Sequence, residues 1–64
     1  MYKVEYINNE LEELESLDFE TFREALYEYL GLLIINWWDY DISELKIIEN
    51  DKDITTKVNE FIYR

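Results

Sequence analysis

The stretch DFETFREALYEYLGLLIINWW, residues 18–38, decides the fold of this chain because it contains the longest helical pattern. Its large apolar side chains recur at a spacing of three or four residues, which is typical of an amphipathic helix with one buried face. We expect that face to consist of Phe19, Phe22, Leu26, Tyr29, Leu30 and Leu33. Gly31 favours an end at Leu30, but the apolar period continues to Trp37, and we therefore favour a helix that ends near Trp38.

The expected start of this helix lies at Asp18. An Asp before a helical pattern is a good N-cap, since its carboxylate accepts from the free N–H groups of the first turn. Leu17 and Phe22 stand at the two positions of a hydrophobic staple around that cap.

Two strands are expected before the helix. Tyr2, Val4 and Tyr6 alternate with Lys3 and Glu5, a period of two that predicts a strand. The following Asn8-Asn9 pair tolerates the positive φ of a tight turn. Residues 10–16 then form either a return strand or a helical turn, because the leucines at 11, 14 and 17 are three residues apart; we favour the strand.

After the helix, residues 45–49 (LKIIE) predict a strand and residues 50–53 (NDKD) a turn. Residues 54–64 are ambiguous. Their β-branched content favours a strand, whereas Ile54, Val58, Phe61 and Ile62 also form a helical stripe with Asp53 as its cap. We choose a strand paired with residues 45–49. The predicted fold is a single α+β domain over residues 1–64, in the order β-β-α-β-β, with one helix on an antiparallel sheet.

Charge and composition limit the possible functions. The 64 residues include 16 Asp and Glu against 6 Lys and Arg, for a formal net charge of −10, and 48% are hydrophobic, which is too many for a disordered chain. Direct binding to nucleic acid or to an anionic membrane is not expected without a basic cluster. Without a secretory signal or a long apolar run, the expected location is cytoplasmic.

Neither catalysis nor a bound cofactor is expected. The chain has no His, no Cys and one Gly, so a neutral-pH base, a thiol nucleophile and a glycine-rich phosphate loop are all missing. Two acidic groups partly resemble a calcium loop, but Glu44 or Ile54 stands where that loop requires Gly, so we expect no metal site. The two groups are Asp39, Asp41, Ser43 and Glu44, and Glu49, Asp51, Asp53 and Glu60.

The acidic residues of the first half form the most informative feature. Between residues 10 and 28 lie eight carboxylates and one base, Arg23. Glu20, Glu24 and Glu28 recur every fourth residue and are expected to form a row on the helix, opposite its apolar stripe. With Glu12, Glu13 and Glu15 nearby, this row predicts a face that enters a basic, nucleic-acid-binding cleft of a partner protein. The alternative is that the acidic residues only keep the protein soluble.

Aromatic residues are the second feature. Trp37 and Trp38 are adjacent and Tyr40 follows, and two adjacent helical residues cannot both face the core. With Trp37 on the buried stripe, Trp38 is expected to be exposed, as Tyr27 and Tyr63 can also be. Trp38 and Tyr40 would then serve as interface anchors beside the acidic face.

In size and composition the chain is similar to the small, acidic, cysteine-free proteins with which phages and mobile elements inhibit host nucleic-acid enzymes. That resemblance implies a non-enzymatic inhibitor with an anti-defence role. The alternative is a small assembly module that forms a homodimer through the Trp37-Trp38 region, which would also help a core of this size, usually worth only about 3–5 kcal/mol.

Overall fold

The structure is a computed structural model and describes residues 1–39 and 42–63. It confirms the α+β class. The elements are, in order, β1 (Tyr2–Asn8), β2 (Glu13–Phe19), α1 (Phe22–Asp39), β3 (Ile42–Glu49), β4 (Lys52–Asp53) and α2 (Thr55–Ile62). The predicted order is therefore right through β3; the two-residue β4 lies in the segment that was expected to be a turn, and a helix replaces the predicted last strand.

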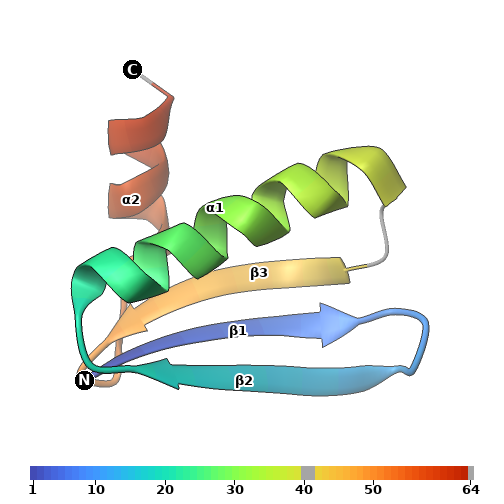
Figure 1. The fold of residues 1–64 in the computed structure, drawn as a ribbon, viewed down its shortest axis with the longest axis horizontal. Helices are drawn as coiled ribbons and strands as arrows, with labels where there is room; N and C mark the ends of the chain where they lie inside the picture. The colour runs from blue at the N-terminus through green and yellow to red at the C-terminus, as the bar shows by residue number, and fades with distance from the viewer. Residues whose placement is uncertain (40–41, 64) are drawn as a thin grey trace.

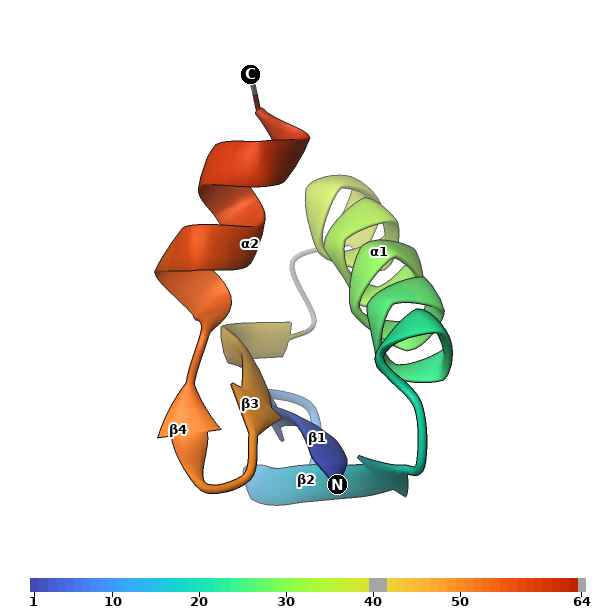
Figure 2. The ribbon, with the colours of Figure 1, turned by 90° about the vertical axis from the view of Figure 1, so that its left-hand side faces the viewer.

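The four strands form one antiparallel sheet in the order β2-β1-β3-β4. Both helices lie on the same face of this sheet, and the other face is open (Figures 1 and 2). α1 packs along β1, β2 and β3, whereas α2 packs on β3. Among the described residues, no helix has the length and hydropathy needed to cross a bilayer.

The first hairpin is confirmed, with a shifted second strand. β1 pairs with β2 from Tyr2 opposite Phe19 to Asn8 opposite Glu13, so the return strand covers residues 13–19 rather than 10–16. The Asn8 side chain shapes the turn by accepting hydrogen bonds from the N–H groups of residues 10 and 11, at 3.0 and 3.2 Å. The positive φ that we expected at Asn8 or Asn9 occurs instead at Glu12 (54°).

The predicted helix start at Asp18 is wrong, because Asp18 belongs to β2 and pairs with Lys3. Strand pairing continues through Phe19, so the cap and the Leu17–Phe22 staple cannot form there. Thr21 caps the helix instead. Its Oγ1 accepts from the Glu24 N–H at 3.3 Å and donates to the Glu24 carboxylate at 2.8 Å, a local arrangement similar to a capping box.

The helix runs through Gly31 to Asp39, as the longer alternative predicted. Its buried face differs from the expected stripe. Ala25, Tyr29 and Leu32 are buried, Leu26 and Leu33 pack beside them, and Phe22 is 39% exposed. The expected burial of Trp37 lies outside the described side chains. The core consists of Val4, Ala25, Tyr29, Leu32, Ile42, Ile47, Ile54 and Val58.

The predicted strand at residues 45–49 is confirmed and begins earlier, at Ile42. An irregularity in the β1–β3 pairing, between Glu5 and Ile7, coincides with a positive φ at Glu44 (51°). This bulge bends β3 so that Ile42 and Ile47 both reach the core.

The predicted strand over residues 54–64 is wrong, because residues 55–62 form α2. β4 ends after two residues, and the next two take over its pairing with β3. The Ile54 N–H donates to the Ile47 carbonyl, and the Thr55 hydroxyl accepts from the Ile47 N–H, both at 3.0 Å. With both backbone groups of Ile47 satisfied, the chain leaves the sheet, and Ile54 and Val58 bury the helical stripe that was the alternative prediction.

Candidate functional site

Four carboxylates from two elements line one side of the molecule. Glu13 and Glu15 lie on β2, opposite Asn8 and Tyr6 of β1, and so share the sheet face that α1 covers. Glu24 and Glu28 lie on α1, four residues apart and therefore on one flank of the helix. We call the four residues Glu13, Glu15, Glu24 and Glu28 the acidic rim.

Tyr6 shows that the two halves of this rim converge. Burial is the main cause that raises the pKa of the Tyr6 phenol, and the negative charges of Glu15 and Glu28 raise it further. Glu15 from the edge strand and Glu28 from the helix therefore act on the same hydroxyl. Both side chains are half-buried, whereas Glu13 and Glu24 are exposed.

The predicted row of carboxylates on the helix differs from the structure in its membership and in its position. Glu20 precedes α1, so it cannot continue a helical row with Glu24 and Glu28. Those two lie beside the buried face, toward the β2 side, rather than opposite it. Glu12 lies in the β1–β2 turn.

Charge is unevenly distributed between the two sides of the sheet. Residues 10–28, which contain β2 and the first part of α1, carry a net charge of −7, with Arg23 as their single base. Residues 42–63 carry −2, because five carboxylates alternate with Lys46, Lys52 and Lys57. The β2 side is therefore nearly unmixed in sign, while the β4 side is mixed.

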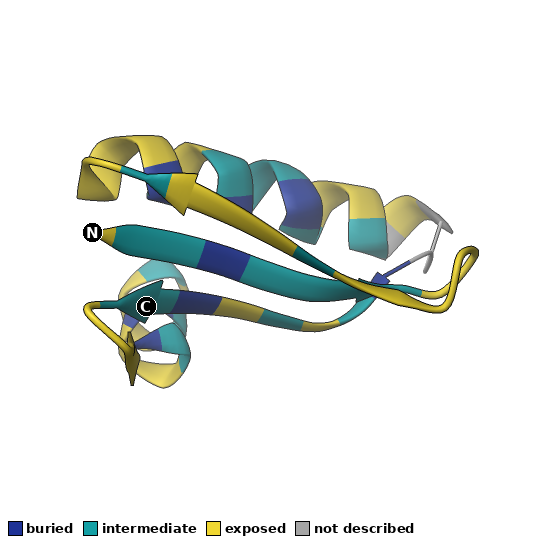
Figure 3. Ribbon diagram, turned by 90° about the horizontal axis from the view of Figure 1, so that it is seen from below, coloured by how far each residue is buried: buried dark blue, intermediate teal, exposed yellow. Residues whose placement is uncertain are grey.

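β2 also has a free edge. It is the outermost strand beside β1, and most of its residues are exposed (Figure 3). Every second residue of an edge strand directs its N–H and C=O groups away from the sheet. Leu17 (37% exposed) adds apolar surface on the same face of β2 as Glu13 and Glu15, whereas Leu14 (66%) points to the open face of the sheet. A partner at this edge would therefore meet charge, backbone hydrogen-bonding groups and apolar area together.

The expected exposure of aromatic residues is confirmed for three of them. Trp38 is 80% exposed, Tyr27 68% and Tyr63 56%. The predicted anchor Tyr40 lies outside the described residues. Trp38 lies near the C-terminal end of α1, whereas Glu24 lies in its first turn, so these two residues occupy opposite ends of the helix.

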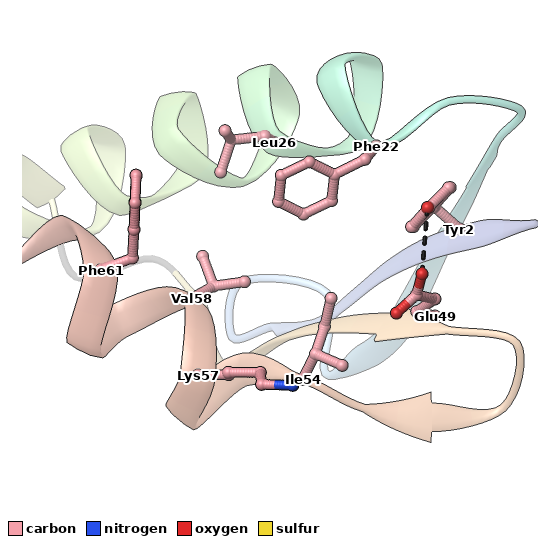
Figure 4. Close-up of a pocket in the computed structure, with 8 residues that line it drawn as sticks. All are labelled: Tyr2, Phe22, Leu26, Glu49, Ile54, Lys57, Val58 and Phe61. Atoms are coloured by element: carbon pink, nitrogen blue, oxygen red, sulfur yellow. Dashed lines mark hydrogen bonds between the residues drawn. The ribbon is translucent and has the colours of Figure 1, made fainter.

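An apolar groove that the sequence pattern did not reveal lies between α1 and α2 (Figure 4). Its volume is about 430 Å³, and apolar side chains from both helices line it, among them Phe22, Leu26, Val58 and Phe61. The Tyr2 ring contacts Phe22 at one end, with ring centroids 5.7 Å apart. The sequence signal for this groove was the helical stripe at residues 54–62, which we had placed in a strand.

Two of the polar groups at the groove, Tyr2 and Glu49, bind each other. The Tyr2 hydroxyl donates to Glu49 Oε1 at 3.1 Å, and this hydrogen bond is the main cause that raises the pKa of Tyr2. Lys57 contributes the cationic group of the lining. The groove is therefore suited to an apolar group, with Lys57 and Glu49 at its border.

The acidic group that partly matched a calcium loop is used for folding. Asp53 Oδ1 accepts hydrogen bonds from the Thr55 N–H and hydroxyl, which are the main causes that lower the pKa of Asp53. Within residues 1–39 and 42–63, the structure holds no group of three or more His, Cys, Asp or Glu arranged to bind a metal ion.

Comparison with known proteins identifies no relative of this chain. The chain matches no protein-family model, and its comparisons with curated proteins and with solved structures give no significant match.

Proposed function

We propose that this protein is a non-catalytic binding protein whose acidic rim occupies a basic, nucleic-acid-binding surface of a partner protein. The observation that supports this proposal most directly is the strand register that places Glu15 beside Tyr6 on the face covered by α1, where the charge of Glu28 also raises the pKa of Tyr6. Residues far apart in the sequence build one negative surface across β2 and α1. A surface that serves only solubility needs no such concentration of one sign.

The mixed charge of the β4 side supports the same proposal. Lys52 and Lys57 lie among carboxylates there, while the rim side has Arg23 alone. A long-range field of one sign at one edge accelerates encounter with a surface of the opposite sign and orients it. Leu17, on the same face of the edge strand as Glu13 and Glu15, supplies a contact that loses water on binding, which charge alone does not provide.

Inhibition follows from competition. A partner surface that binds phosphates cannot hold nucleic acid and the acidic rim at the same time. In this proposal the protein therefore acts as an inhibitor, and an anti-defence role in a phage or mobile element is one setting in which such an inhibitor is useful. Association is expected to weaken as salt rises, because the interacting charges are screened.

The test immobilises the protein, passes a bacterial lysate over it, and then washes with competitor duplex DNA. A rim variant carries Glu13→Gln, Glu15→Gln, Glu24→Gln and Glu28→Gln, which removes four charges and keeps side-chain size. A matched control carries Glu5→Gln, Glu44→Gln, Glu49→Gln and Glu60→Gln, away from the rim. The expected result is a nucleic-acid-binding protein that DNA releases, that the control retains and that the rim variant loses. Equal retention by the rim variant contradicts the proposal.

A further inference from the structure

The second half of α1 is apolar on the side that faces away from the sheet. Residues 30–38 (LGLLIINWW) contain no charged residue, and Asn36 is their single polar one. A surface helix normally has a polar outer face. Here Tyr27 is 68% exposed, Ile34 54% and Trp38 80%.

These exposed residues lie on one line along the helix. Tyr27, Gly31, Ile34 and Trp38 are spaced at i, i+4, i+7 and i+11, which places them on the same face; we call them the outer stripe. Gly31 is its small member. A Cβ at Gly31 would meet no atom within 4 Å, so packing inside the chain does not require glycine there. Glycine is unfavourable inside a helix, and the gap it leaves opens outward.

We infer that the outer stripe is the interface of a two-fold homodimer in which two copies of α1 pack antiparallel. In that arrangement Tyr27 lies opposite Trp38 of the second copy, and Gly31 lies opposite its Ile34. Each large side chain then meets a complementary position, and Ile34 fills the gap above Gly31. A stripe that matches itself after a two-fold rotation is the requirement for an isologous interface.

Charge favours a second copy over a basic partner at this stripe. The outer stripe holds no carboxylate, so a basic protein would gain little from it. Of the acidic rim, Glu24 and Glu28 flank the stripe only at its Tyr27 end, so two chains of net charge −10 can meet through the uncharged part that runs from Gly31 to Trp38. Added salt should strengthen this association, because it screens the repulsion between two chains of like net charge.

The available area is sufficient for a dimer of moderate affinity. An aromatic side chain buries about 150–250 Å², and at the observed exposures Tyr27, Ile34 and Trp38 offer about 500 Å² per chain. The total of about 1,000 Å² is near the lower limit for a specific interface. An interface of this size suits a weak, reversible dimer, so its fraction should depend on protein concentration.

Sedimentation equilibrium from about 1 to about 300 µM tests this inference, since the dimer fraction rises with concentration. Ile34→Glu places two carboxylates in the interface and should weaken association at least about 100-fold. The matched control is Leu14→Glu, which adds the same charge at a leucine that is 66% exposed on β2. The control should dimerise as the parent does.

Gly31→Leu is a second variant that the single chain tolerates, because the space around Gly31 is open. It should weaken the dimer while leaving the thermal unfolding temperature of the dilute monomer unchanged or higher. If Ile34→Glu fails to fold, Gly31→Leu still tests whether the outer stripe is the dimer interface. A parent chain that is monomeric throughout, or a dimer that neither substitution weakens, overturns the inference.

Single-cysteine variants test the antiparallel orientation, since the chain has no cysteine of its own. Equivalent residues at position 27 of the two copies would lie about 16 Å apart along the helix axis, as would those at position 38. Tyr27→Cys and Trp38→Cys should therefore form a disulfide when mixed, and much less when oxidised alone. Efficient self-linkage of each variant would indicate parallel helices and overturn the proposed arrangement.

This inference does not depend on the proposed function. The rim variant should remain dimeric, and Ile34→Glu should keep its affinity for a basic partner if the rim alone binds it. A result that contradicts the dimer therefore leaves the proposed partner binding untouched, and the reverse also holds.

Discussion

The hydroxyl of Tyr29 donates a hydrogen bond to Oδ1 of Asn59 and so joins the buried face of α1 to α2. Tyr29 is 1% exposed, and burial is the main cause that raises the pKa of its phenol. This hydrogen bond holds α2 against α1 and so stabilises the second helix, for which the sequence pattern alone left a strand as the alternative.

Tyr29→Phe removes this hydrogen bond and keeps the ring in the core. The free energy of unfolding is expected to fall by about 0.5–1.5 kcal/mol in urea denaturation. Asn59→Ala should cost a similar amount, and the double variant should cost less than the sum of the two. The control is Tyr27→Phe, whose exposed hydroxyl should contribute little. Additive effects of Tyr29→Phe and Asn59→Ala would show that the two side chains do not interact.

Thr21→Ala tests the corrected helix start. Its hydroxyl accepts the Glu24 N–H, so the substitution should lower the free energy of unfolding by about 1 kcal/mol. Asp18→Ala, at the start expected from sequence, should change it by less than about 0.5 kcal/mol, because Asp18 is exposed on β2. If Asp18→Ala is the more costly of the two, helix capping by Thr21 is wrong.

Local sequence patterns correctly predicted those elements on which no distant part of the chain imposes a different structure. The alternation from Tyr2 to Tyr6 predicted β1, and the helical period correctly carried α1 past Gly31. The helix start failed because residues 17–19 satisfy two patterns. Asp18 resembles an N-cap, but Phe19 pairs with Tyr2, a partner distant in the sequence. Pairing across that distance cannot be determined from a local motif.

The prediction for the C-terminal segment was wrong, and that for the acidic rim was incomplete, for the same reason. Both structures depend on contacts between residues that are far apart in the sequence. Residues 54–62 fit a strand and a helix equally, and the hydrogen bonds of Ile47 with Ile54 and Thr55 decide between them. The sequence likewise identified Glu15 and Glu28 but not their convergence, which depends on the β1–β2 register. The groove between the helices was not predicted, since it requires α2.

Asp53 predicts a dependence of stability on pH. Its hydrogen bonds from Thr55 lower its folded-state pKa below 3.8, so ionised Asp53 stabilises the fold above pH 3.8. That stabilisation is lost as the pH falls through the lowered pKa. In urea denaturation, the parent should exceed Asp53→Asn in stability at pH 6, and the difference should shrink below pH 3.8. Asp51→Asn in the adjacent turn corrects for the loss of one charge. A difference that stays constant from pH 6 to pH 2 would contradict this role.

Glu28→Gln tests the geometry of the acidic rim without any partner. Because the Glu28 carboxylate helps raise the pKa of Tyr6 above 10.0, removing its charge should move that pKa back toward 10.0. A raised phenol pKa stabilises the fold below pH 10.0, and this contribution is lost as the pH rises through the folded-state value. NMR titration of ring-labelled tyrosine measures the change, with Tyr6→Phe identifying the signal. Glu60→Gln on α2 is the control, and an equal shift in both variants would mean that net charge, rather than the position of Glu28 beside Tyr6, determines the titration.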